Sequence, residues 1–280
     1  MVKSPIKVIV RTRPTPNIAA QNIQIFESKS QIEINIPKNE AQGIINHQQE
    51  SWKFKFDKIL HNKSQGETFE TLEKDILKNS LKGYSGTVLC YGQTSAGKTH
   101  TMIGDQSDIN LRGIIPRIIE SLFREIQSKN DKTIAFKVSY AEIYNETIVD
   151  LFNPTSSENI VINEHSKKGI FLKGLTHKVC STQQEALQYL AQGEVNRTVA
   201  STAMNSKSSR SHAIFTIYLE IKPKIELGEK IVHSKINLVD LAGSERTKKT
   251  KSEGKTLVEA NHINKSLFFL EQVRFILFGK

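Results

Sequence analysis

The sequence predicts an α/β fold, in which one β-sheet carries helices on both of its faces and residues 1–280 form a single domain. The main observation is that strand-like and helix-like segments alternate along the chain, with no internal repeat and no linker rich in proline, glycine or serine. The second observation is that one strand-like segment, residues 87–91, leads directly into a glycine-rich loop of the kind that binds phosphate groups.

The first third of the chain is predicted to be mainly β-structure. Residues 7–11 are largely apolar and β-branched, and prolines follow them, which indicates a strand. Residues 22–36 alternate apolar and polar side chains, as in an exposed hairpin, and residues 52–56 repeat this alternation. Residues 68–81 place their apolar side chains at helical spacing, and we expect this helix to end at Gly83.

The remainder of the chain is predicted to mix helices with longer strands. Residues 98–102 contain no helix breaker and can open a helix after the glycine-rich loop, and residues 114–126 have an amphipathic helical pattern. Residues 133–149 indicate a strand followed by a turn at Asn145. The further predicted elements are a helix over residues 183–191, strands over residues 213–221 and 235–241, and a last long helix over residues 256–277.

The composition argues against a membrane-spanning protein and against a disulfide-rich secreted one. No apolar run reaches the length of a membrane-spanning helix. The two cysteines, Cys90 and Cys180, show no metal-ligand spacing and indicate a reducing, intracellular setting. The net charge of +10 agrees with an acidic partner, such as nucleic acid, anionic lipid or an acidic protein surface. Lysines that are simply solvated explain the same charge. The positions of the basic residues along the chain therefore have to distinguish an acidic partner from a solvated surface.

The strongest motif is the phosphate-binding loop, or P-loop, at residues 92–99. Its two glycines let the backbone curl, so that several N–H groups point at phosphate oxygens. Lys98 supplies a positive charge for the β- and γ-phosphates, and the Thr99 hydroxyl is placed to bind Mg²⁺. We therefore predict that a nucleoside triphosphate binds along Gly92, Gln93, Thr94, Ser95, Ala96, Gly97, Lys98 and Thr99.

A second motif follows the predicted strand at residues 235–241. Asp240 stands at the strand tip, where a carboxylate can hold Mg²⁺ through water, and the amide of Gly243 can approach the γ-phosphate closely. GTPases share this Asp-x-x-Gly pattern. However, the Asn-Lys pairs at residues 62–63 and 264–265 lack the aspartate of a guanine-reading motif, and Asp240 lies much further from the P-loop than in a compact GTPase. The sequence therefore argues against a GTPase.

Seven stretches together resemble the kinesin motor domain, and they occur in the order typical of that family. They are residues 11–14, 83–87, 91–102, 139–144, 208–212, 240–245 and 263–267. The resemblance covers nearly the whole chain. It implies a kinesin motor fold of the P-loop NTPase type, with a mostly central, mixed β-sheet, and an ATPase activity that microtubules activate.

Three further stretches, residues 46–49, 234–237 and 270–273, are most similar to the kinesin-9 class, which is associated with cilia and flagella. This similarity implies microtubule-based movement in the cytoplasm and at the cytoskeleton, with the axoneme of a cilium or flagellum as the expected location.

The resemblance also implies roles for single residues around ATP and Mg²⁺. The adenine contacts it implies are Arg11, Arg13, Pro14 and His100, and the residues that arrange Mg²⁺ and its waters are Thr99, Ser209 and Asp240. Arg210 and Glu245 are expected to pair and close the site, which would orient the attacking water and let Glu245 receive its proton through a second water. The other residues implied in hydrolysis are Ser208, Gly243 and Asn264.

The basic residues near the end of the chain gain a role from the same resemblance, because the loop and helix after Asp240 are the principal microtubule contact of the family. The implied contacts with tubulin are Lys248, Lys249, Lys251, Lys255, Lys265 and Arg274. Tubulin has an acidic surface, so salt should weaken this attraction. The alternative is a solvated basic helix end without a partner.

By the family pattern, we expect this motor domain to be incomplete at its C-terminal end. A further microtubule-binding loop and helix, a final strand, a final helix and the neck linker would follow residue 280. Two hypotheses therefore stand: a microtubule-activated ATPase that forms a motor core, and a non-motile, kinesin-like module that binds nucleotide or tubulin. Dimerisation, direction of movement and cargo are not predicted by any pattern in the sequence.

Overall fold

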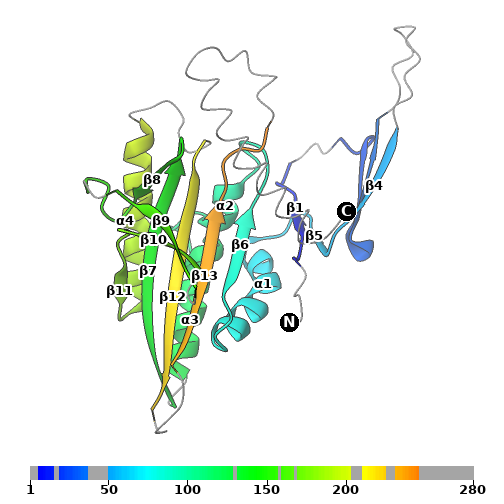
Figure 1. Cartoon of the computed structure of the whole chain (residues 1–280). Helices are drawn as coiled ribbons and strands as arrows, with labels where there is room; N and C mark the ends of the chain where they lie inside the picture. Colours follow the sequence, from blue (N-terminus) through cyan, green and yellow to red (C-terminus); the bar gives the residue numbers. More distant parts are fainter. Residues whose placement is uncertain are drawn as a thin grey trace. The chain divides into compact units, whose positions relative to one another are not determined.

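A computed structural model describes residues 6–15, 19–36, 50–128, 131–156, 159–166, 169–202, 210–224 and 231–245 of the chain (Figure 1). The chain divides into two compact units, Met1–Thr68 and Phe69–Lys280. Each unit has its own β-structure, which follows from the strand patterns of its sequence.

The first unit contains two small sheets. Strands β2 (Ile23–Phe26), β3 (Gln31–Asn35) and β4 (Ser51–Lys55) form an antiparallel sheet, with the short 3₁₀ helix η1 (Glu27–Lys29) between β2 and β3. Apolar residues stand opposite one another across this sheet, since Ile34 pairs with both Ile23 and Trp52. The predicted alternation in residues 22–36 and 52–56 is therefore confirmed.

The second small sheet of this unit consists of β1 (Ile9–Arg11) and β5 (Lys58–Leu60), which run parallel. Ile59 and Leu60 of β5 are buried. The strand predicted at residues 7–11 is thus confirmed, whereas β5 was not predicted, because three residues are too few to show a period.

The second unit is built on a six-stranded mixed sheet. Its strand order is β11-β7-β12-β13-β6, with β8 paired to β7. Strand β13 runs parallel to β6, and the other pairings are antiparallel. The strands are β6 (Gly86–Cys90), β7 (Lys132–Tyr144), β8 (Thr147–Asp150), β11 (Lys178–Cys180), β12 (His212–Pro223) and β13 (Val232–Asp240). The mixed sheet that the sequence implied is therefore present.

The centre of this sheet is strongly apolar. Strands β7, β12 and β13 contribute fully buried side chains such as Val138, Phe215 and Leu238. The Tyr140 and Phe215 rings meet edge to face, with their centroids 5.3 Å apart. The strands predicted at residues 133–149, 213–221 and 235–241 are confirmed, including the turn at Asn145, which has a positive φ.

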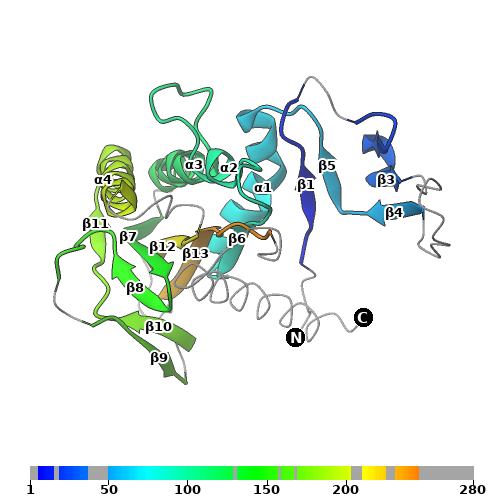
Figure 2. The same cartoon turned by 90° about the horizontal axis from the view of Figure 1, so that it is seen from above.

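Helices α2 (Lys98–Met102), α3 (Ile114–Ser128) and α4 (Gln183–Thr202) lie along one face of the sheet, as Figure 2 shows. Helix α3 packs its apolar stripe, including Ile115, Ile118 and Leu122, into the core. Helix α1 (Gln65–Ser80) begins at the end of the first unit and adds Phe69 to the same core. The helix predicted at residues 256–277 lies outside the described residues.

One predicted boundary was wrong. Helix α4 continues to Thr202, eleven residues beyond the predicted end at residue 191. The helix passes through Gly193, and a Cβ added there would lie 2.3 Å from Cδ1 of Tyr140. Gly193 therefore serves the close approach of α4 to the sheet and does not break the helix.

Three short elements of the second unit were not predicted. They are β11 and the antiparallel hairpin of β9 (Val161–His165) and β10 (Gly169–Lys173), whose apolar residues Ile162 and Ile170 are exposed. Within the described part of the chain, no helix is long and apolar enough to cross a membrane.

Candidate nucleotide site

The P-loop connects β6 to α2, as the sequence predicted. Gly97 has a φ of 94°, a left-handed conformation that favours glycine, and α2 begins at the next residue, Lys98. The Lys98 ammonium donates to the carbonyl oxygens of Gly92 and Gln93, at 2.9 Å each. Burial lowers the pKa of Lys98, and the nearby carboxylates of Asp240 and Glu245 partly oppose this shift.

The parallel pairing of β6 and β13 brings the two predicted motifs together. Cys90, just before the P-loop, stands opposite Asp240, so both strands end at the same edge of the sheet. The hydroxyl of Thr99 donates to Oδ2 of Asp240 at 2.6 Å. The backbone N–H of Ser244 donates to the carbonyl oxygen of Gly92 at 3.1 Å, which joins the residues after β13 to the loop.

Glu245 also contacts the P-loop. One of its carboxylate oxygens accepts the backbone N–H of Thr94 at 2.8 Å, and the other accepts the Thr94 hydroxyl. Gly243 permits this approach, since a Cβ there would lie 2.3 Å from the Thr94 hydroxyl oxygen. Burial alone would raise the pKa of Glu245, but the hydrogen bonds from Thr94 and the charge of Lys98 outweigh it and lower that pKa.

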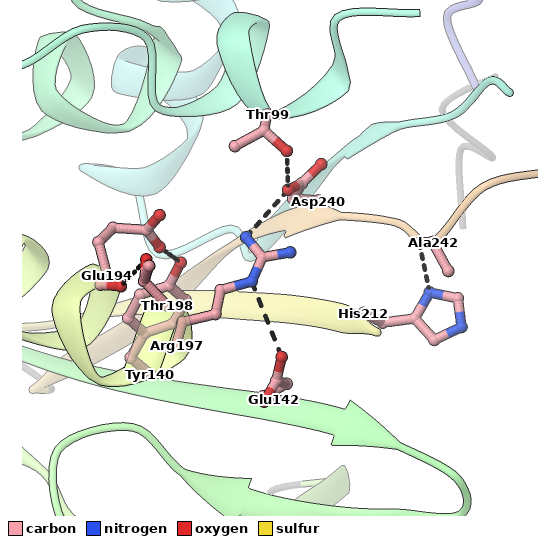
Figure 3. A network of polar contacts seen from close by, with 9 residues as sticks. All are labelled: Thr99, Tyr140, Glu142, Glu194, Arg197, Thr198, His212, Asp240 and Ala242. Carbon is pink, nitrogen blue, oxygen red and sulfur yellow. Dashed lines mark hydrogen bonds and ion pairs between the residues drawn. The ribbon is translucent and has the colours of Figure 1, made fainter. Parts of the chain in front are cut away.

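Arg197 of α4 contacts Asp240 inside the protein, where both side chains are buried (Figure 3). Its Nη1 donates to Oδ2 of Asp240 at 3.1 Å, and its Nε lies 3.9 Å from Oε1 of Glu142 on β7. All three side chains are at most 4% exposed. Burial acts to lower the pKa of Arg197, but Tyr140, Asp240 and Glu194 raise it above the ordinary value, so the guanidinium stays charged.

Asp240, Arg197 and Glu142 form a network of buried polar contacts, and Glu194 extends it. Glu194 lies one helical turn before Thr198. It accepts a hydrogen bond from the Tyr140 hydroxyl, while its backbone carbonyl accepts the Thr198 hydroxyl at 2.8 Å. Burial raises the pKa of Glu194, although Arg197 and Tyr140 partly oppose this effect. The network therefore ties α4 to β7 as well as to β13 (Figure 3).

His212 connects the start of β12 to the segment after β13. Its Nδ1 accepts the backbone N–H of Ala242 at 3.1 Å, which identifies the neutral ring as the acceptor. Burial lowers the pKa of His212, and the negative charge of Asp240 partly opposes this shift. The segment that carries Gly243 and Glu245 is thus held on two sides, by β12 and by the P-loop.

The donor set at Asp240 suits Mg²⁺. Its Oδ1 is buried and, among the described residues, has no hydrogen-bond partner, and the Thr99 hydroxyl is bonded to the other oxygen. The described residues contain no group of three or more His, Cys, Asp or Glu that could hold a metal ion. One carboxylate with a hydroxyl, completed by water and substrate phosphates, is the arrangement that Mg²⁺ typically adopts in nucleotide sites.

The structure brings together most of the predicted nucleotide residues of the second unit. Residues 92–99, Asp240, Gly243 and Glu245 meet at one sheet edge. His100 lies in α2, next to Thr99, and Arg210 is half-buried, two residues before β12 begins.

The remaining predicted residues belong to the first unit or fall outside the described ranges. Arg11 is in the first unit, where its guanidinium donates to Oε1 of Gln65 at 2.8 Å and to the carbonyl oxygen of Lys63 at 3.3 Å. Arg13 and Pro14 follow it and are exposed. The predicted residues outside the described ranges are Ser208, Ser209, Asn264, Lys248, Lys249, Lys251, Lys255, Lys265 and Arg274.

The sequence interpretation missed the residues behind Asp240, namely Glu142, Glu194 and Arg197. One signal was available for Glu142, because a glutamate interrupts the apolar run of β7 and must therefore be buried with a partner. Arg197 and Glu194 gave no such signal, since the helix that carries them was predicted to end before them.

Comparisons of this chain with a family profile, with curated sequences and with solved structures all identify kinesins as similar. The sequence profile of the kinesin motor domain family matches residues 11–278. Kinesin-like protein KIF9 of Mus musculus is 46% identical over 273 residues, covering 95% of this chain and 34% of the relative. Kinesin-like protein KLP1 of Chlamydomonas reinhardtii is 44% identical, covering 97% of this chain and 35% of the relative. A solved structure of a fast kinesin has a TM-score of 0.78 and 37% identity, covering 92% of this chain and 71% of that one.

Proposed function

Because the chain belongs to the kinesin motor domain family, we propose that it is the catalytic core of a microtubule-activated, ATP-hydrolysing motor. The observation that carries this proposal is the meeting of the P-loop with Asp240 and Glu245 at one sheet edge. The chain spans about a third of the length of the curated relatives it matches, so the proposal concerns the motor core alone.

The P-loop would bind the nucleotide phosphates. Its backbone N–H groups and Lys98 provide positive charge, and Thr99, Ser209 and Asp240 would hold Mg²⁺ and its waters. Mg²⁺, when bound, would neutralise charge on the β- and γ-phosphates. Arg11, Arg13, Pro14 and His100 would contact the adenine, as the family resemblance implies.

Glu245 would take part in the hydrolysis step together with Arg210. Its lowered pKa keeps the carboxylate ionised near neutral pH, so it can receive a proton through water. Pairing with Arg210 would close the site, while Ser208, Gly243 and Asn264 would complete the surroundings of the attacking water. Gly243 supports this role, because a Cβ there would lie 2.3 Å from the Thr94 hydroxyl oxygen and 2.5 Å from the Glu245 carboxylate, so their contact would have to shift.

Microtubules would bind through the basic residues that follow Glu245. The set is Lys248, Lys249, Lys251, Lys255, Lys265 and Arg274. The net charge of +10 agrees with attraction to an acidic filament surface. The similarity of residues 46–49, 234–237 and 270–273 to the kinesin-9 class supports movement along microtubules in a cilium or flagellum.

The test is the steady-state ATPase rate of the purified chain with and without microtubules. We expect stimulation that weakens as the salt concentration rises, because exposed charges are screened beyond about 10 Å at 0.1 M salt. Nucleotide binding without any stimulation would instead identify a non-motile binding module, the second hypothesis from the sequence.

Replacement of Glu245 tests the assignment of the hydrolysis step. Glu245→Ala should still bind ATP, measured with a fluorescent ATP analogue, whereas turnover should fall by about a hundredfold or more. The reason is that the phosphate-binding residues of the P-loop are unchanged, whereas the proton acceptor is lost together with its hydrogen bonds from Thr94. Unchanged turnover in a variant that binds ATP normally would contradict the assignment.

A further inference from the structure

Glu142, Ala213 and Asp240 form one row across three neighbouring strands. Ala213 of β12 stands directly opposite Glu142 of β7 on one side and Asp240 of β13 on the other. Directly opposed residues point to the same face of a sheet, so the two carboxylates lie on one face, about 10 Å apart at their backbones. The small side chain of Ala213, which is buried, leaves the space between them open.

The guanidinium of Arg197 fills that space from α4 (Figure 3). It donates from Nη1 to Asp240 Oδ2 at 3.1 Å, and its Nε lies 3.9 Å from Glu142 Oε1. One buried cation is therefore shared between two buried carboxylates, and only one of these belongs to the nucleotide site. Charges that are removed from water in this way act strongly on one another.

The hydrogen bond between Arg197 and Asp240 uses only some of the polar atoms that the guanidinium and the carboxylate could contribute. Within the part of the chain that the structure describes, Arg197 Nη2 and Asp240 Oδ1 are buried and make no hydrogen bond. A guanidinium and a carboxylate readily form two parallel hydrogen bonds, which would use these two atoms as well. The attraction of Glu142 for Nε acts against this rearrangement, because it draws the guanidinium away from Asp240.

We propose that Glu142 is a positioning residue for Mg²⁺-nucleotide binding, which holds Arg197 in a shared position and so prevents it from forming a second hydrogen bond to Oδ1 of Asp240. This inference rests on the proposed function, since it concerns the same site. Without the Glu142 charge, Arg197 would move fully onto Asp240 and occupy both oxygens. Asp240 would then be a poorer acceptor for the waters around Mg²⁺.

The experiment measures the affinity for a fluorescent ADP analogue twice, in excess Mg²⁺ and in EDTA. The ratio of the two affinities reports the contribution of Mg²⁺ and does not depend on hydrolysis. Glu142→Gln keeps the size of the side chain but removes its charge, and it should lower this ratio about five- to tenfold. Glu142→Asp keeps the charge but withdraws it by one methylene group, so a smaller decrease is expected.

Asp150→Asn is the matched control. Asp150 is a buried carboxylate on the adjacent strand β8, where it accepts backbone N–H groups of Phe152 and Thr176. Its replacement should lower the melting temperature and leave the Mg²⁺ ratio unchanged. A purely structural role of Glu142 would produce the same result as this control.

The outcomes separate the inference from the proposed function. A ratio that falls in both Glu142 variants and not in Asp150→Asn supports the inference, and Glu142→Asp keeps the test valid if Glu142→Gln does not fold. An unchanged ratio, or equal losses in Mg²⁺ and in EDTA, overturns the inference but leaves nucleotide binding in place. A wild-type chain that binds no nucleotide in either condition overturns both.

Discussion

At the scale of single residues, the hydroxyl of Thr99 makes a structural contact in addition to the Mg²⁺-binding role that the sequence motif predicts. It is expected to bind Mg²⁺, and the structure shows that it also donates to the buried carboxylate of Asp240 at 2.6 Å. Because Asp240 is only 2% exposed, water cannot easily replace this donor. Thr99 therefore contributes to folding, in addition to the ligand-binding role proposed for it.

Replacement of Thr99 by valine should show both functions. Thr99→Val keeps the shape of the side chain but removes the donor, so the free energy of unfolding should fall by about 1–3 kcal/mol. Nucleotide affinity in Mg²⁺ should fall at the same time. Thr99→Ser restores the hydroxyl and should recover most of both quantities in denaturant titration and nucleotide binding; a serine variant as weak as valine would contradict this explanation.

Gly193 is the second residue whose replacement should be costly. Gly193→Ala places a Cβ 2.3 Å from the Tyr140 ring, so helix or sheet has to shift, at a cost of about 1–3 kcal/mol of unfolding free energy. Alanine is otherwise a better helix former than glycine, and a surface glycine in a helix would respond in the opposite direction.

Gly86 is the matched control for Gly193, since an added Cβ there would meet nothing within 4 Å. Thermal unfolding of Gly86→Ala should therefore resemble that of the wild type. A Gly193→Ala variant as stable as Gly86→Ala would show that α4 does not need its close approach to Tyr140.

At the scale of elements, the contact of β12 with the segment after β13 should depend on pH. The pKa of His212 is lowered by burial, so the ring resists protonation in the folded protein but binds a proton below about pH 6.5 in the unfolded chain. The unfolded state then holds more protons, and the free energy of unfolding decreases as the pH falls below that value.

His212→Asn should reduce this pH dependence, because asparagine can offer an acceptor oxygen to the Ala242 N–H without titrating. The measurement is urea unfolding of both proteins between pH 8 and pH 5.5, with the nucleotide site left free of ligand. Equal slopes of stability against pH in the two proteins would show that His212 is not responsible.

The elements also show which parts of the fold a sequence can predict. Long apolar strands such as β7 and β12, and the amphipathic helix α3, carry enough residues for their periods to be recognised. The three-residue strands β5 and β11 do not, because tertiary pairing alone defines them. The end of α4 was missed for a related reason, since the role of Gly193 depends on a ring that lies 53 residues earlier in the chain.

The candidate site divides in the same way. The meeting of residues 92–99 with Asp240 and Gly243 could be predicted, because each motif has the local spacing that is typical of phosphate and Mg²⁺ sites. Arg197 could not be predicted, and Glu142 could be recognised only as a buried carboxylate without a known partner, because the register of β7, β12 and β13 brings the site together and no local pattern records that register. The buried contacts of Asp240 with Arg197, and of Arg197 with Glu142, are therefore visible only in the structure.

At the scale of the whole molecule, we propose that the two compact units, Met1–Thr68 and Phe69–Lys280, unfold as one motor domain. Trp52, the single tryptophan of the chain, lies in β4 of the first unit. Its fluorescence, excited at about 295 nm, therefore reports on that unit, while circular dichroism reports mainly on the larger one. Coincident thermal transitions are the test of a single cooperative unit.

If the units unfold together, the Trp52 fluorescence and the circular dichroism should give the same midpoint and the same apparent enthalpy. Addition of Mg²⁺ and ADP should then raise both midpoints equally, since a ligand of the folded state stabilises everything that unfolds with it. Two separate midpoints, or a shift in only one of them, would show that the units are independent domains.

The parallel pairing of β6 with β13 also has a consequence for the order in which the proposed nucleotide site is assembled. The loop is synthesised early, but its partners arrive about 150 residues later, since Thr94 and Glu245 are 151 positions apart in the chain. Contacts between such distant positions close a large loop, so they tend to form late in folding. During synthesis or refolding, binding of ADP should thus begin only when the pairing of β6 with β13 is complete. The time course of fluorescent ADP binding would then measure the rate of that final folding step.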